Sequence, residues 1–192
     1  MASNDLLNQI IPQSVATNIY NDTMQFGLAL LLARLVLQKN ILDKEWLIKS
    51  LLILLGFAAY QLTINRFINT SMYVSGNLKL AIDDVLKFGT MLLVSRYLSS
   101  KSLSDDEWMK EVGFMLTGFV SYSLVTQRLL NNNVINVNTL SPNLSLAISD
   151  GLKFSTMYLV SRWLSGNEFS REWMLESAGF TIGVMSYDYF SN

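Results

Sequence analysis

The chain has 192 residues, of which 51% are hydrophobic and 15% are charged, and its formal net charge is -1. It contains no cysteine and no histidine, which excludes disulfides, most zinc sites and the Ser-His and Cys-His catalytic pairs. Soluble domains carry about 25% charged residues, so this composition favours a bilayer, and the small net charge shows no nucleic-acid footprint. The composition therefore predicts a protein that is not an enzyme, holds no metal or cofactor and binds no nucleic acid.

Residues 1–17 form an N-terminal segment outside the pattern that fills the rest of the chain. Leu6, Leu7, Ile10 and Ile11 have helical spacing ahead of Pro12. The spacing leaves two readings open, a short amphipathic helix lying on a surface or a frayed terminus.

One unit is repeated three times, over residues 18–66, 82–127 and 148–192. Each copy has an Asp, a Phe four residues later, an Arg twelve residues after the Asp, then a Trp, and a Gly ten residues after the Trp. The equivalent residues are Asp22, Asp84 and Asp150; Arg34, Arg96 and Arg162; Trp46, Trp108 and Trp173; Gly56, Gly118 and Gly183. Such self-similarity at a fixed spacing predicts a repeat architecture.

Every unit contains two apolar segments joined by a short polar turn. The first segments cover about 19–37, 82–99 and 148–165, the second about 45–64, 107–127 and 172–189, and neither Pro12 nor Pro142 lies in any of them. A helix of about 20 residues spans about 30 Å, the thickness of a hydrocarbon core. We predict an all-α fold of three helical hairpins, six transmembrane helices in parallel repeats, with irregular polar links at 67–81 and 128–147.

The second segments begin with helix-start signals. Ser104 and Glu107 fit a capping box, while Asp43 with Glu45 and Ser170 with Glu172 are looser versions. A Trp follows directly each time, where a membrane-interface aromatic would lie, although a core Trp under the end of a bundle fits as well.

Charges weaken the transmembrane prediction. Lys87 and Arg96 leave only eight uncharged residues between them, and nine residues of helix rise only about 13 Å. A soluble or interfacial array of helices is therefore an alternative to the transmembrane fold. The first unit argues against this alternative, because its helices are apolar on almost all faces. The turns carry nine basic residues and the opposite side five, which predicts cytosolic turns with the termini across the membrane.

The repeated polar residues have both structural and functional interpretations. We interpret the Asp set as helix N-caps and the Arg set as anchors for lipid phosphate or for Glu45, Glu107 or Glu172. An alternative places Arg34, Arg96 and Arg162 in a ring that lines a small three-repeat channel or carrier. The Gly set predicts close helix packing.

The tracts LKFGTMLLVSRYLS and LKFSTMYLVSRWLS, the DDEWMKE turn and the Asn-rich links resemble multi-span virion membrane proteins of nucleocytoplasmic large DNA viruses. The resemblance implies a structural protein of the virion inner membrane, a minor capsid component that links the bilayer to capsid or other membrane proteins. Whether it also forms a homo-oligomer is left open.

Overall fold

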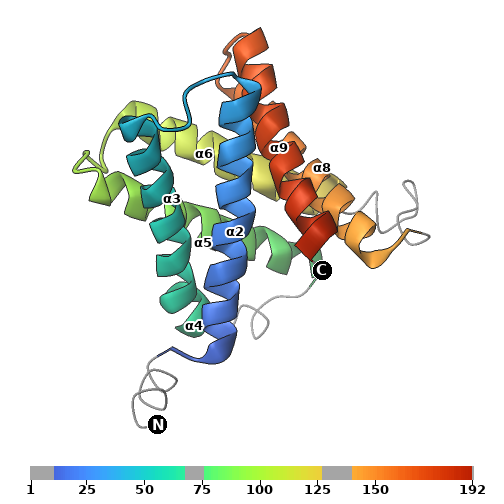
Figure 1. The fold of residues 1–192 in the computed structure, drawn as a ribbon. Coiled ribbons are helices and arrows are strands. Elements are labelled where there is room, and N and C mark those ends of the chain that lie inside the picture. Colours follow the sequence, from blue (N-terminus) through green and yellow to red (C-terminus); the bar gives the residue numbers. More distant parts are fainter. Residues whose placement is uncertain (1–10, 68–75, 127–139, 192) are drawn as a thin grey trace.

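The computed structural model describes residues 11–67, 76–126 and 140–191, and within them the fold is all-α, with no strand. Six long helices form three hairpins (Figure 1). They are α2 (Gln13–Val36), α3 (Lys44–Leu62), α5 (Gly76–Leu98), α6 (Asp106–Ser121), α8 (Pro142–Leu164) and α9 (Arg171–Ser191), and a short helix α4 (Ile64–Phe67) follows α3. The prediction of three tandem helical hairpins is confirmed.

The first helix of each hairpin begins six residues earlier than we predicted. Helix α2 starts directly after Pro12, α5 starts at Gly76, and α8 starts with Pro142. The prediction that Pro142 lies outside the helical segments was therefore wrong, whereas Pro12 lies outside α2 as predicted. Proline is tolerated in the first helical turn because the N–H that it lacks would have no partner there. The side chain of Ser141 caps α8 by accepting from the Leu144 N–H.

The second segment of repeat 2, predicted as one helix over 107–127, changes character near its end. Helix α6 stops at Ser121 and a π-helical turn, η2 (Tyr122–Thr126), follows it. The remaining parts of the two polar links, 68–75 and 127–139, lie outside the described residues, as do residues 1–10 of the N-terminal segment.

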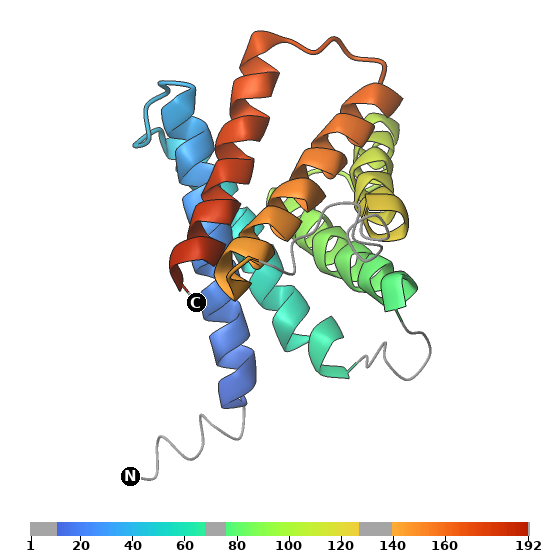
Figure 2. The same cartoon turned by 90° about the vertical axis from the view of Figure 1, so that its right-hand side faces the viewer.

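The three hairpins close into a ring. The second helix of each hairpin packs on the first helix of the next, α3 on α5 and α6 on α8, and α9 returns to pack along α2. Figures 1 and 2 show α2 and α9 side by side, although they lie at opposite ends of the sequence. The repeats are therefore parallel, and each occupies an equivalent place around one axis.

Three phenylalanines from the first helices meet on that axis. The ring centroids of Phe26, Phe88 and Phe154 lie 5.7 to 5.9 Å apart in edge-to-face contacts. Phe57 stacks on Phe26 and Phe119 stacks on Phe88, each at 4.1 Å. These aromatic rings, at separations where edge-to-face and offset contacts are favourable, make up the core and close the axis at this level.

The repeated glycines lie where consecutive hairpins cross. A Cβ on Gly56 would come 2.6 Å from the Met91 carbonyl oxygen, and one on Gly118 would come 2.6 Å from the Met157 Cα. On Gly183 it would come 2.4 Å from the Ala29 Cα. The predicted packing role of this set is confirmed, because only a residue without a side chain lets the backbones approach this closely.

Taken singly, most of the long helices that the structure describes do not have the length, hydropathy and low charge of a membrane span. Within the described residues, one helical stretch, Lys44–Phe67, is long and apolar enough to cross a bilayer. No other helix among the described residues combines the length, hydropathy and low charge of such a span. Length and hydropathy thus support one candidate span where the sequence pattern predicted six.

Candidate functional site

A ring of charged and amide side chains surrounds the axis one helical turn from the phenylalanines. The Lys87 ammonium lies 2.5 Å from an Asp22 carboxylate oxygen, and Lys153 lies 3.3 Å from Asp84. Each pair joins the first helix of one repeat to the first helix of the next. Gln61, at the end of α3, donates a further hydrogen bond of 2.6 Å to Asp22.

The third junction of this ring has a different composition. Gln25 takes the place that Lys87 and Lys153 hold in the other repeats, and its amide donates to Asp188 at 2.7 Å and to Asp150 at 3.4 Å. Lys153 also lies 3.5 Å from Asp150. The ring therefore contains four carboxyl groups and two ammonium groups, and the junction between α8, α9 and α2 is its acidic part.

This arrangement corrects our interpretation of the Asp set as N-caps. Asp22, Asp84 and Asp150 lie well inside α2, α5 and α8, and the caps of α2 and α8 are Pro12 and Ser141. Asp22 and Asp84 are buried and are held by charged or amide partners across the axis. Burial of a carboxylate is tolerated when such partners supply hydrogen bonds.

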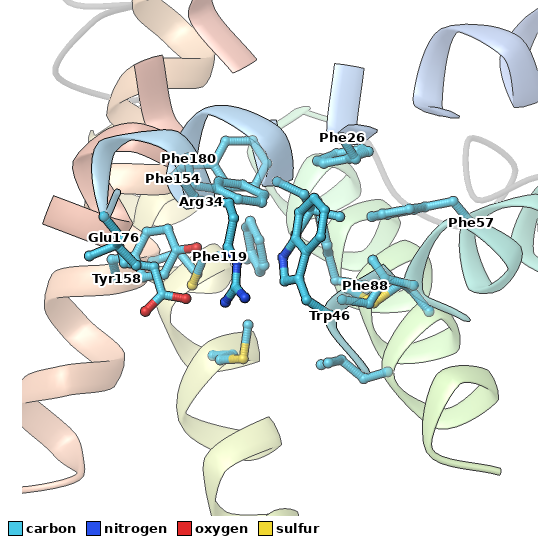
Figure 3. A pocket seen from close by; sticks show the side chains of 18 of the residues that line it. Phe26, Arg34, Trp46, Phe57, Phe88, Phe119, Phe154, Tyr158, Glu176 and Phe180 are labelled. Atoms are coloured by element: carbon cyan, nitrogen blue, oxygen red, sulfur yellow. The ribbon is translucent and has the colours of Figure 1, made fainter. Parts of the chain in front are cut away.

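On the other side of the phenylalanines, toward the turns, lies a pocket of about 210 Å³. Its floor is aromatic, and methionine and aliphatic side chains from every repeat form its walls (Figure 3). The floor residues are Phe26, Phe57, Phe88, Phe119, Phe154 and Phe180. Arg34, Leu37 and Lys39, at the end of α2 and in the turn after it, place the polar side of the pocket at the turn end of the bundle.

Polar groups gather at the open end of this pocket. Arg34, Lys39 and Glu176 line it together with Trp46 and Tyr158, and Figure 3 shows the ends of Arg34 and Glu176 directed to the same open side. Lys39 is paired with Glu172. Among the described residues, Glu176 has no ion-pair or hydrogen-bond partner, and the Tyr158 hydroxyl makes no hydrogen bond. An apolar cavity with few convergent polar groups is typical of a small-molecule site.

The three arginines each fasten their own turn. The Nε of Arg34 donates to the Asn40 carbonyl at 3.1 Å, that of Arg96 to Ser102 at 3.0 Å, and that of Arg162 to Glu168 at 2.7 Å. In every case the acceptor lies six residues after the arginine. We call each arginine, with this carbonyl and the tryptophan described next, a turn clamp.

The tryptophans complete the turn clamps. The guanidinium carbon lies over the ring of Trp46, Trp108 or Trp173, at 5.5, 5.2 and 5.4 Å from the centroid. This is the geometry of a cation–π contact. Each tryptophan is half-buried and belongs to the first turn of the second helix. Its ring therefore connects the arginine of the first helix to the start of the second.

The cap residues belong to the same assembly and differ in part from our prediction. Asp43, Asp105 and Ser170 accept from the N–H of the following tryptophan, so Asp105 and not Ser104 caps α6. Arg34 and Arg96 also pair with these aspartates, at 3.4 and 2.8 Å, not with Glu45 or Glu107. The hydrogen bond from the Trp108 N–H, aided by Arg96, holds the pKa of Asp105 below its ordinary value.

The structure thus brings the Asp set together on the axis and keeps the Arg set apart, one in each turn. Sequence reasoning missed Lys87, Lys153, Gln25 and Asp188 as members of the ring. A usable signal was present, because Lys follows Asp by three residues in repeats 2 and 3 and Gln stands there in repeat 1. The pocket left no such signal, since it is formed by side chains from all three hairpins.

Among the described residues, no group of three or more Asp or Glu side chains is arranged to hold a metal ion. Arg34 is the only member of the predicted Arg set that reaches the axial pocket within the part of the chain that the structure describes. No family model, curated protein or solved structure matches the chain.

Proposed function

We propose that the protein is a non-enzymatic structural protein of a membrane, in which the ring of three hairpins stands across the bilayer. The observation that carries the proposal is the division of polar and apolar side chains. Lys79 and Asp83 of α5 pair with each other, and the other charges of the first helices lie in the polar ring or the turn clamps. Large apolar side chains are exposed on the outside.

The outer surface supports contact with lipid. Large hydrophobic side chains are exposed on all six long helices. Examples are Met24, Leu51, Leu93, Met109, Leu159 and Ile182. In the stretch Lys44–Phe67 only 28% of the apolar window is buried, whereas the core helix of a soluble protein would be mostly buried. Contiguous exposed apolar surface of this kind marks a membrane or protein contact.

The charges that weakened the transmembrane prediction have partners away from the outer surface. Lys87 is paired with Asp22 across the axis, and Arg96 is fastened to its own turn. Ionisable residues within membrane segments commonly face the bundle interior and pair there. The eight uncharged residues between Lys87 and Arg96 therefore do not set the apolar length that lipid would contact on α5.

We further propose that the membrane is the inner membrane of a virion and that the links and termini bind capsid or other membrane proteins. The resemblance of repeats 2 and 3 to virion membrane proteins supports this assignment. The charge bias supports turns on the cytosolic side. Detection of the protein in purified particles, with removal by detergent but not by salt, is the expected result; its absence from particles would overturn the viral assignment.

The geometry does not favour a channel or carrier built on the arginines. Arg34, Arg96 and Arg162 each bind a turn carbonyl and cover a tryptophan. The contact of Phe26, Phe88 and Phe154 closes the axis. A transport function would need both features to change.

Single cysteines test the membrane assignment, since the native chain has none. Lys101→Cys places a thiol in a turn, and Leu93→Cys places one on the outer surface, where Leu93 is 48% exposed. In membranes, a charged maleimide should label the first variant and leave the second unlabelled, until denaturation exposes it. Equal labelling of both in native membranes, together with release of the protein by carbonate, would overturn the proposal.

A further inference from the structure

We propose that the axial pocket is a binding site for one neutral, single-chain amphiphile of medium chain length. Its alkyl chain would lie on the aromatic floor, and its hydroxylated head would lie at the turn end beside Arg34, Glu176 and Tyr158. This inference goes beyond the structural role and does not depend on it, because the pocket belongs to the interior of the ring.

The size and lining of the pocket define the chain. An apolar cavity of about 150 Å³ takes benzene, and one water occupies about 30 Å³ of liquid. The axial pocket, at about 210 Å³, therefore has room for about seven methylene-sized groups. Aromatic and methionine side chains line it, and such surfaces adapt to an alkyl chain without offering it hydrogen bonds.

The repeats differ at two positions that line the pocket. Phe180 of repeat 3 is replaced by Ile53 in repeat 1 and by Met115 in repeat 2. A phenylalanine at all three positions would fill space that the two smaller side chains leave open. Tyr158 likewise stands where repeats 1 and 2 have Leu30 and Leu92, and it adds a hydroxyl at the pocket wall.

The mouth of the pocket defines the head group. Arg34 and the Tyr158 hydroxyl offer hydrogen-bond donors, and the carboxylate of Glu176 offers an acceptor. Arg34 pairs with Asp43 and Lys39 with Glu172, so groups of both charges lie at the mouth. Glu176 would repel an anionic head, and Arg34 would repel a cationic head. A hydroxylated, uncharged head can accept hydrogen bonds from Arg34 and the Tyr158 hydroxyl and donate one to Glu176, without charge repulsion.

The direct test uses an eight-carbon monoacylglycerol with a photoreactive diazirine in its chain. The purified protein is placed in phospholipid nanodiscs, irradiated with the probe and mapped by mass spectrometry. Label on pocket-lining residues of α3 and α6, displaced by unlabelled monoacylglycerol, is the expected result. Label confined to outward-facing residues such as Leu51 and Leu93 would overturn the proposal. If the protein proves water-soluble, the same experiment runs in buffer, so the two proposals fail separately.

Pocket filling supplies a matched control. The variant Ile53→Phe/Met115→Phe copies the residue of repeat 3 into the pocket, and Leu51→Phe makes a comparable change on the outer surface of α3. We expect the filled variant to lose about tenfold of the displaceable labelling, or about 1.4 kcal/mol, and Leu51→Phe to keep it. Single Ile53→Phe replaces the double variant if thermal melting shows that the latter does not fold. Equal labelling of filled and control proteins would overturn the site.

Competition identifies the head group. Octanol and monooctanoylglycerol should displace the probe at lower concentration than octanoate or octyltrimethylammonium, which carry opposite charges on the same chain. Glu176→Gln should improve competition by octanoate, because it removes the negative charge of the unpaired carboxylate at the mouth. Stronger competition by either ion in the native protein would overturn the neutral-head assignment.

Discussion

At the residue scale, a glycine decides how closely two hairpins approach. Gly118 lies against the backbone of Met157, and Gly56 and Gly183 make the equivalent contacts at the other two crossings. Helix-interior glycine ordinarily costs about 0.5–1 kcal/mol relative to alanine. The close approach at the crossing offsets that cost, since it allows the helices of neighbouring repeats to pack directly.

Gly118→Ala should therefore destabilise the protein, by about 1–3 kcal/mol, because the added methyl would overlap backbone atoms that cannot rotate away. Gly113→Ala is the control on the same helix, since a Cβ there has nothing within 4 Å. The control should be neutral or stabilising by up to about 1 kcal/mol. Unfolding free energies from titration with denaturant or SDS measure both. Equal effects of the two substitutions would contradict the packing assignment.

At the element scale, the first helices hold the charges that connect one repeat to the next. Lys87 of α5 reaches Asp22 of α2, and Lys153 of α8 reaches Asp84 of α5. Lys87 lies over the rings of Phe26 and Phe57, and Lys153 lies over the ring of Tyr122, so aromatic rings shield one side of each ion pair. The same helices end in the turn clamps, where the arginine binds the turn and not a neighbouring repeat.

Lys87→Met should destabilise the ring strongly, on the order of 3 kcal/mol, because it leaves the buried Asp22 carboxylate without its counter-ion. Lys49→Met is the control, since Lys49 forms an exposed pair with Glu45 on the outside of α3, and such pairs contribute about 0.5 kcal/mol or less. The same denaturant or SDS titration compares the two variants. If both cost equally little, the polar ring is not a source of stability.

At the scale of the whole molecule, the ring has no terminal repeat. Linear repeat arrays need capping units because the end repeats would otherwise expose an apolar face. Here α9 packs on α2, with Gly183 and Gly179 against Ala29 and Ala33. The first and last helices of the chain therefore serve as neighbours, and each hairpin is covered on both sides.

Closure of the ring predicts a cross-link between the two ends of the chain. The Tyr187 hydroxyl lies 3.2 Å from the Asn21 side-chain oxygen, so Asn21→Cys/Tyr187→Cys should join efficiently through a short bifunctional thiol reagent. Tyr20→Cys/Tyr187→Cys is the control, because Tyr20 is 62% exposed on the outer surface. A protease site inserted between repeats, followed by gel electrophoresis, shows whether the fragments stay linked. Links formed only between separate chains would contradict the closed ring.

The sequence by itself determined the local and periodic features. Threefold spacing of Asp, Arg, Trp and Gly specified the hairpins, the short turns and the crossing glycines, because these depend on residues close in the chain or on the helical period. The starts of the first helices were predicted six residues too late, and Pro142 was placed outside a helix although a first helical turn accepts proline.

Only the tertiary structure decided what the charges do. The sequence around Asp22 predicts a helix cap. Its hydrogen-bond partners are instead Gln61 and Lys87, which are 39 and 65 residues away along the chain. Arg96 reads as a charge in an apolar segment, yet it completes its own turn. The axial pocket depends on side chains of all three hairpins at once. Such contacts follow from ring closure, a long-range property that the spacing of residues within one repeat does not encode.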